Sequence, residues 1–291
     1  MELLSKMLRI QNPTPEERSA LTAMLKCYAT STWNTRCGIY TRFNKWATGA
    51  PLTPLKAVSF LVQVPVSIQA KLSYVKALKA LCLVQGQDPT PLSLYSKSLV
   101  AQGALVPIHQ AAPLTHAMTE RLLSFVKDKG TRIAIKTARK TCSRWSEAAG
   151  ITRDMCPTIS EQRVVIAWGQ RHKTGRLKPV SRHMYTVIEG SWTRDIASHL
   201  RTLKDGQPLS RWSTQKLTRV MKKLFGHDYS SHSIKSGGIS YLLTLVTQGI
   251  ITLEQVARLA KHENVESTLG YGREPEVVAL ALGTQRVTSL L

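Results

Sequence analysis

Two short segments in the last third of the sequence carry side chains suited to chemistry on a phosphodiester. His232 and Lys235 lie in SSHSIKSGG, and His262 and Tyr271 lie in LAKHENVESTLGYGR. A tyrosine oxygen can attack phosphorus and hold it covalently, while histidine and lysine supply movable protons and positive charge. The order and spacing of these four residues predict a site that joins DNA strands.

The spacing of the first pair predicts a shared helical turn. His232 and Lys235 are three residues apart, so they occupy adjacent positions on one face of a helix. Gly237 and Gly238 follow directly, and their lack of a side chain lets DNA or another helix approach closely. We therefore expect His232 and Lys235 to share one site.

The second pair requires a change of chain direction. Nine residues separate His262 from Tyr271, which on one straight helix would place the two side chains on opposite faces. Glu263 and Asn264 are suited to a turn between them. Each of these residues also has a structural interpretation, since Tyr271 can be a packed aromatic and His262 a cation at the end of a helix. Only their combination favours chemistry.

Further upstream, two other segments contain candidate residues for the same site. Arg144 and Glu147 lie one helical turn apart in RWSE, where the alternative is a surface ion pair. Lys173 lies in the polar, basic stretch QRHKTGR, between segments of extended pattern. A cationic arm of this kind can reach a DNA groove or a leaving oxygen, although a basic hairpin by itself is a weak signal.

The composition favours a polyanionic partner. The chain of 291 residues has 40 Lys and Arg against 18 Asp and Glu, for a formal net charge of +22. Such a charge attracts nucleic acid. Because the chain is also 43% hydrophobic and the charge is spread along it, we expect folded domains with a basic face and not a basic low-complexity tail.

The cysteines and the apolar segments predict an intracellular protein. The five cysteines are odd in number and lack C-x-x-C spacing, which argues against a disulfide framework or a zinc site and favours reduced core thiols. They are Cys27, Cys37, Cys82, Cys142 and Cys156. The N-terminus lacks the apolar region of a signal peptide, and no apolar stretch is long enough to span a bilayer, so no membrane segment is expected.

The first part of the chain is expected to be a small helical domain. From Thr14 to about Leu83 the sequence reads as helices separated by breakers, with a restart at Thr53-Pro54. Trp33 and Tyr40 belong to a helix with an aromatic face and a basic flank, for which DNA contact is one interpretation. Residues 85–113 appear loop-like because they are rich in Gly and Pro, and we place the domain boundary there.

The second part is expected to be mixed. Helices are predicted over 115–130 and 132–149, followed by a β-hairpin with strands at Val164–Trp168 and Leu177–Val180 and a basic tip between them. Helices are then predicted over 192–203, 213–225, 236–247 and 253–260. Thr252 and Gln255 form a plausible capping box for the last of these.

Taken together, these residues resemble the tyrosine recombinase (phage integrase) family. That family has an Arg in an R-x-S-E-like box, a hairpin Lys, H-x-x-R, a His or Trp, and then the nucleophilic Tyr. The order here is Arg144, Lys173, His232, Lys235, His262 and Tyr271. One position departs from the family pattern, because Lys235 replaces the second arginine and offers a point charge in place of a planar fork. Arg273, just after the tyrosine, is a candidate to compensate.

The resemblance implies a fold and a mechanism. The fold would be mainly α with a small β-hairpin or sheet, comprising a helical core-binding domain with linker over 1–112 and an α+β catalytic domain over 113–291. Tyr271 would attack the scissile phosphate and form a 3′-phosphotyrosyl link, without metal or other cofactor. Arg144, Lys235 and His262 would stabilise the developing charge, and His232 would accept the tyrosine proton. Lys173 would protonate the leaving oxygen, and Glu147 would orient the cations.

The resemblance also implies partners and leaves alternatives open. The partners would be double-stranded DNA and further copies of the chain, as a tetramer on two DNA sites, in the integration or transposition of a mobile element. A eukaryotic element, and hence a nuclear location, is one hypothesis. The alternatives are a type IB topoisomerase or telomere-resolvase-like enzyme, and a DNA-binding descendant with impaired catalysis marked by Lys235.

Overall fold

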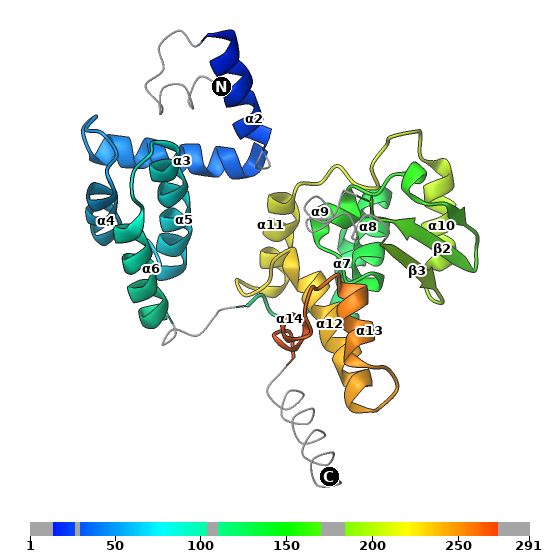
Figure 1. Cartoon of the computed structure of the whole chain (residues 1–291). Coiled ribbons are helices and arrows are strands. Elements are labelled where there is room, and N and C mark those ends of the chain that lie inside the picture. Colours follow the sequence, from blue (N-terminus) through cyan, green and yellow to red (C-terminus); the bar gives the residue numbers. More distant parts are fainter. Residues whose placement is uncertain (1–13, 27–29, 104–109, 170–183, 273–291) are drawn as a thin grey trace, which may run out of the picture. The chain divides into compact units, whose positions relative to one another are not determined.

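The computed structural model describes residues 14–26, 30–103, 110–169 and 184–272 (Figure 1). The chain divides into two compact units, residues 1–108 and 109–291. Each unit has its own hydrophobic core. The protein is mainly helical, with one small antiparallel sheet in the second unit. The predicted fold class is therefore confirmed.

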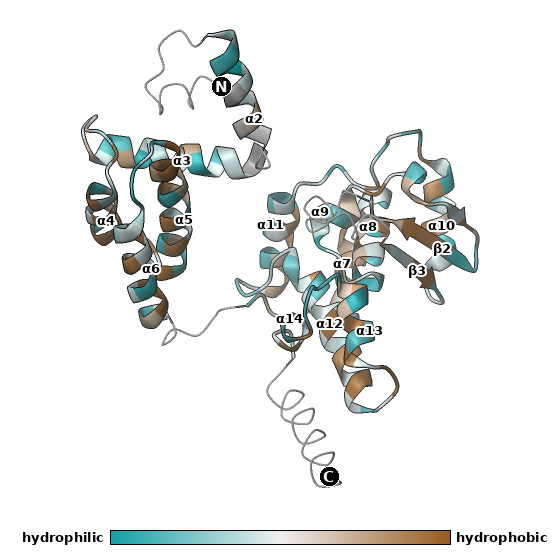
Figure 2. Cartoon of the chain, in the orientation of Figure 1, coloured by the Kyte–Doolittle hydropathy of each residue, from teal (hydrophilic) through white to brown (hydrophobic). Residues whose placement is uncertain are grey.

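Among its described residues, the first unit contains helices joined by short loops and no strand. Its elements are α2 (Pro15–Lys26), α3 (Thr30–Trp46), α4 (Pro54–Gln63), α5 (Ile68–Val84) and α6 (Thr90–Gly103). Helix α4 begins where the sequence predicted a restart, because the Thr53 side chain accepts a hydrogen bond from the Lys56 N–H. Pro54 suits the first helical position, where an N–H would have no partner within the helix. Hydrophobic residues gather on α4, α5 and α6 (Figure 2), where Phe43 of α3 packs edge-on against Phe60.

Helix α6 corrects the loop expected over 85–113. Pro91 is at the start of α6, where its missing N–H costs nothing, so this proline initiates a helix and does not interrupt one. Leu92 and Leu99 are fully or almost fully buried against the core of the first unit. Packing of these two leucines supports a helix in a segment whose Gly and Pro content suggested a linker.

The second unit contains the remaining helices and the sheet. Its helices are α7 (His116–Phe125), α8 (Lys129–Lys140), α9 (Trp145–Ala149), η1 (Arg153–Met155), α10 (Thr193–Thr202), α11 (Thr214–Phe225), α12 (His232–Thr247), α13 (Leu253–Ala260) and α14 (Glu266–Leu269). The strands are β1 (Thr158–Ile159), β2 (Arg163–Ala167) and β3 (Tyr185–Glu189), in the order β1-β2-β3. The buried residues of α7 to α11 and of β2 form one core.

The sheet differs in part from the predicted hairpin. Strand β2 lies where the first strand was expected, but it pairs with β1 on one side and with β3 on the other, where Val165 lies opposite Val187. The expected second strand, Leu177–Val180, and the basic tip lie outside the described residues. Strand β3 alternates buried and exposed residues, with Ile188 buried and Tyr185 and Val187 exposed. This pattern is typical of a sheet with one face on the core.

The helix predicted over 132–149 is interrupted. Helix α8 ends at Lys140, and Cys142 adopts a positive φ of 46°, which breaks the helical path. The short helix α9 then starts after Arg144, whose backbone N–H donates to Glu147 Oε2. The interruption points the side chains at Ser143 and Arg144 away from the line of α8, and it places Arg144 at a helix N-terminus.

Helix α13 begins where the sequence predicted. The capping box of α13 is confirmed, because Gln255 N–H donates to Thr252 Oγ1 and Thr252 N–H to Gln255 Oε1. Cys82, Cys142 and Cys156 are buried free thiols, whereas Cys37 is only partly buried and so is not the core thiol that was expected. Cys27 lies outside the described residues. Within the described ranges, no helix has the length and apolar character needed to cross a bilayer.

Candidate active site

Helix α12 begins at His232, before the start of the predicted helix 236–247, and carries His232 and Lys235 on its first turn, as their spacing predicted. Gly237 and Gly238, which follow this turn, let α12 pack closely against neighbouring backbone. A Cβ on Gly238 would lie 2.9 Å from the Arg139 carbonyl oxygen, and one on Gly237 would overlap the Leu114 backbone. The two glycines therefore allow α12 to pack closely against α8 and the segment before α7. Of the two roles expected for them, approach of DNA or of another helix, the structure shows the second.

Arg144 and Glu147 stand beside this turn at the start of α9. Arg144 Nη1 donates to Glu147 Oε1 at 3.3 Å, and the Arg144 N–H donates to Glu147 Oε2 at 3.1 Å. The Glu147 side chain is only 7% exposed, whereas that of Arg144 is 39% exposed. The pair is therefore not a solvated surface ion pair. The carboxylate holds the Arg144 backbone N–H and one guanidinium nitrogen, and it leaves the rest of the guanidinium open to a ligand.

Tyr271 lies against both histidines. His232 Nε2 and Tyr271 Oη are 2.9 Å apart, and the His262 ring stacks on the tyrosine ring with centroids 5.4 Å apart. The turn expected between His262 and Tyr271 is present, since Lys261 ends α13 in the left-handed conformation and α14 follows. Ser240 Oγ also donates to the Tyr271 carbonyl oxygen, which ties the tyrosine to α12.

The surroundings keep both histidines neutral at neutral pH. Burial, with the charges of Lys235 and Arg144, lowers the pKa of His232 below its usual value. Burial and the same two cations lower the pKa of His262 to about 4. His262 is further fixed by a hydrogen bond between Nδ1 and Thr268 Oγ1 at 2.9 Å. A neutral His232 next to the hydroxyl of Tyr271 can accept its proton.

The tyrosine itself is held in its protonated form until a base acts. Burial raises the pKa of Tyr271, and the nearby charge of Arg144 opposes this effect. For such a tyrosine to attack a phosphate, a proton acceptor and a cationic field would both be needed, because the phenolate is scarce at neutral pH. The His232 ring contacts its hydroxyl, and the charge of Arg144 lies nearby.

Lys235 is fully buried, not solvated. Its Nζ donates to the Ala260 carbonyl oxygen at 2.8 Å, at the end of α13. Burial, together with repulsion from Arg144, lowers its pKa to about 8, while Glu147 opposes the fall. An ammonium has three donors, and the bond to Ala260 uses one of them. Lys235, at the position where the resembled family has an arginine, is thus enclosed in the candidate site and held there by a hydrogen bond.

Lys261 is a site residue that the sequence reasoning missed. Its ammonium donates to Ser143 Oγ at 2.6 Å, lies 3.8 Å from Glu147 Oε2, and stands 3.6 Å from the centre of the Trp168 ring. The side chain is 2% exposed. At the end of α13, a lysine is ordinarily a solvated cation that favours the helix dipole, so its sequence position gave no reason to select it.

The structure thus brings together six residues, of which five were predicted as catalytic candidates and one, Glu147, as supporting. They are Arg144, Glu147, His232, Lys235, His262 and Tyr271. Lys173 and Arg273 lie outside the described residues. The arrangement can hold an anion beside a tyrosine hydroxyl that has a neutral base in contact. Within the described ranges, no group of three or more His, Cys, Asp or Glu residues has a metal-binding arrangement.

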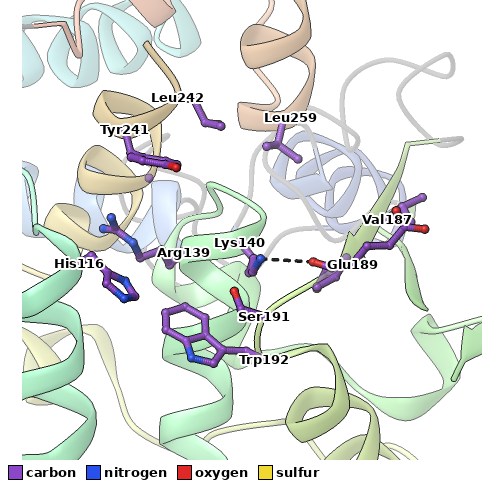
Figure 3. Close-up of a pocket in the computed structure, with 12 residues that line it drawn as sticks. His116, Arg139, Lys140, Val187, Glu189, Ser191, Trp192, Tyr241, Leu242 and Leu259 are labelled. Carbon is purple, nitrogen blue, oxygen red and sulfur yellow. Dashed lines mark hydrogen bonds between the residues drawn. The ribbon is translucent and has the colours of Figure 1, made fainter. Parts of the chain in front are cut away.

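A second concave region lies between α8, α12 and β3 (Figure 3). The labelled side chains of Arg139, Trp192 and Tyr241 line it, and Lys140 Nζ donates to the Glu189 carbonyl oxygen. Burial lowers the pKa of Arg139. None of the six residues of the candidate site lines this pocket, so the two regions are separate.

Comparison with known proteins identifies the fold. No family model matches the sequence, and no curated protein matches it by sequence. Among solved structures, the chain is similar to the Tn1549 transposon integrase in complex with transposon right end DNA, at 15% identity over 99% of this chain and 98% of that one, with a TM-score of 0.59. It is also similar to the lambda integrase dimer bound to a COC′ core site, at 12% identity over 93% and 76% of the two chains, with a TM-score of 0.55.

A third similar structure is the XerH site-specific recombinase bound to a palindromic difH substrate, at 13% identity over 86% and 78% of the chains, with a TM-score of 0.53. All three belong to the class of integrases and recombinases that the sequence motifs resemble. The chain has the fold of the tyrosine recombinases. At these identities the likeness concerns the fold alone.

Proposed function

We propose that this protein is a site-specific DNA recombinase that cuts and rejoins DNA through a 3′-phosphotyrosyl link at Tyr271. The observation that carries the proposal is the hydrogen bond between Tyr271 Oη and His232 Nε2 at 2.9 Å, next to two buried or half-buried cations, Arg144 and Lys235. A partly buried tyrosine in contact with a neutral base and a cationic field is an activated nucleophile. The fold and the formal net charge of +22 support DNA as the substrate.

The chemistry assigns one task to each group. Tyr271 Oη bonds to phosphorus, the bond from phosphorus to the 5′ oxygen breaks, and the tyrosine proton passes to His232 Nε2. Arg144, Lys235 and His262 stabilise the charge on the nonbridging oxygens. Lys173 protonates the leaving 5′ oxygen. Reversal of these steps with another strand's 5′ hydroxyl rejoins the DNA.

The two units divide the work. Residues 1–112, the N-terminal helices with the linker after them, would bind DNA as a core-binding domain, and residues 113–291 would carry out breaking and rejoining. In the first unit, the Arg36 guanidinium lies 5.5 Å from the centre of the Trp33 ring, on the helix with the basic flank. Integration or transposition by a homo-oligomer follows from the resemblance to DNA-bound integrases and remains a prediction.

The test uses duplex DNA from the sequences that flank the gene, nicked near the candidate cleavage site so that the cut end diffuses away. The expected product is a covalent protein–DNA adduct that forms in the presence of a chelator and is absent in Tyr271→Phe. Tyr241→Phe is the matched control, because Tyr241 is exposed on α12 and outside the site. This control should form the adduct at the wild-type rate.

The outcomes separate the alternatives. An adduct together with exchange of strands between two duplexes supports a recombinase, whereas an adduct with relaxation of supercoiled DNA and no exchange supports the topoisomerase-like alternative. Tight binding of the flanking DNA with no adduct supports a DNA-binding descendant. A wild-type adduct that persists in Tyr271→Phe contradicts the assignment of the nucleophile.

A further inference from the structure

The Glu147 carboxylate has a second cation beside it, Lys261, in addition to Arg144. Burial raises the pKa of this carboxyl, but Lys261, the Arg144 backbone N–H and the charge of Arg144 together hold it below its usual value. The distances agree with this account, at 3.8 Å from Oε2 to Lys261 Nζ and 3.3 Å from Oε1 to Arg144 Nη1. Glu147 therefore bridges two cations, one at each of its oxygens.

Lys261 is held for this contact at some conformational cost. Its backbone has φ 58° and ψ 41°, a left-handed conformation that favours glycine or asparagine over a long side chain. Its side chain then leaves solvent and is enclosed by Ser143, Trp168 and Glu147. A lysine at the end of a helix is usually solvated. The burial of Lys261 therefore depends on its contacts with Ser143, Glu147 and Trp168.

Ser143, one of the partners of Lys261, is itself held by a hydrogen bond. Ser143 Oγ, which accepts from Lys261 Nζ, also lies 2.6 Å from Thr141 Oγ1 in the break between α8 and α9. The chain of contacts thus runs from that break through Lys261 and Glu147 to Arg144. Thr141, Ser143 and Lys261 are buried and the Glu147 side chain is 7% exposed, whereas the Arg144 side chain is 39% exposed.

We propose that Lys261 is a positioning residue for Arg144, acting through Glu147. Lys261 anchors one carboxylate oxygen, so the other oxygen holds the guanidinium in the orientation that meets a nonbridging phosphate oxygen. The same ammonium offsets the charge of Glu147, so the positive charges of Arg144 and Lys235 remain available to the phosphate. This inference rests on the proposed function. It assigns to Lys261 a role that the resemblance does not imply.

The first test measures single-turnover cleavage of the nicked duplex. Lys261→Met fills the same space without charge, and Lys261→Gly suits the left-handed backbone, so the two variants carry different risks to folding. Both are expected to cleave on the order of 10- to 100-fold more slowly, because small errors in the placement of a catalytic group are costly. Lys204→Met, at an exposed position, is the matched control.

A double-mutant cycle tells positioning from independent effects. If Lys261 acts through Glu147, the variant Lys261→Met with Glu147→Gln should be no slower than the slower single variant. Multiplied effects overturn the proposal, as do rates within twofold of wild type in both single variants. Thermal unfolding of each variant shows whether the fold is kept.

A second measurement does not depend on cleavage. The rate at which a glyoxal reagent modifies Arg144, followed by mass spectrometry, should rise at least twofold in Lys261→Met, because the guanidinium loses its fixed partner. An unchanged rate overturns the proposal. If wild-type protein forms no adduct on any flanking DNA, the proposed function fails, and the Arg144 modification rate still decides the role of Lys261.

Discussion

Replacing Lys235 by methionine should leave the protein at least as stable at pH 7 while it removes cleavage. Lys235 is 0% exposed, and its pKa falls from 10.5 to about 8. Because one pKa unit corresponds to about 1.4 kcal/mol, keeping this ammonium charged in the folded protein costs about 3 kcal/mol relative to the unfolded chain. Methionine has a similar length and carries no such cost.

One contact opposes this gain. Loss of the bond from Lys235 Nζ leaves the Ala260 carbonyl oxygen without that donor, at a cost of about 1–3 kcal/mol. The net change in the free energy of unfolding should therefore lie between about zero and +2 kcal/mol at pH 7. Cleavage should nevertheless fall by on the order of 100-fold or more, since a donor to the phosphate is lost.

The stability gain should depend on pH in a fixed direction. The folded-state pKa of Lys235 lies below its unfolded value, so the cost is fully present below about pH 8 and disappears as the pH rises toward 10.5. Urea unfolding of wild type and Lys235→Met at pH 7 and pH 10 measures both values. The advantage of the variant should shrink at pH 10.

Two results would refute this reasoning. A loss of more than about 2 kcal/mol in Lys235→Met at pH 7 would show that the ammonium contributes more to the fold than it costs. A cleavage rate close to wild type would show that Lys235 does not act on the phosphate. Lys235→Arg completes the set, because unchanged or slower cleavage indicates a working lysine and faster cleavage indicates a damaged arginine site.

Three further predictions concern pH, packing and salt. The cleavage rate should fall at acidic pH as His232 gains a proton and above about pH 8 as the buried lysines lose theirs, so a rate that is flat from pH 5 to 10 would contradict these roles. Gly237→Ala should lower the melting temperature strongly, because its Cβ meets the Leu114 backbone, whereas Gly38→Ala on α3 meets no atom within 4 Å and should raise it slightly. DNA affinity measured by anisotropy should drop on the order of 10³-fold or more between 50 and 200 mM salt if about six phosphates are contacted, and a shallow slope would argue against a phosphate-dominated interface.

Features that depend on neighbours in the sequence could be predicted well. The three-residue spacing of His232 and Lys235 placed them on one helical turn, and Thr252 and Gln255 marked the start of α13. Both signals are local, because a helix repeats over a few residues and a cap satisfies nearby N–H groups. The same local logic failed at Pro91, where a helix start resembled a linker until burial of Leu92 and Leu99 decided it.

The sequence by itself thus determined the types and order of the reactive residues, the basic character of the chain and most of its helices. Only the tertiary structure decided that Tyr271 meets His232, that Lys235 is buried, and that Lys261 joins Glu147. These contacts link residues far apart in the chain and form only when α12 packs against α9 and α13. The sequence does not distinguish a solvated lysine from a buried one, so only the packing shows that Lys235 and Lys261 are buried.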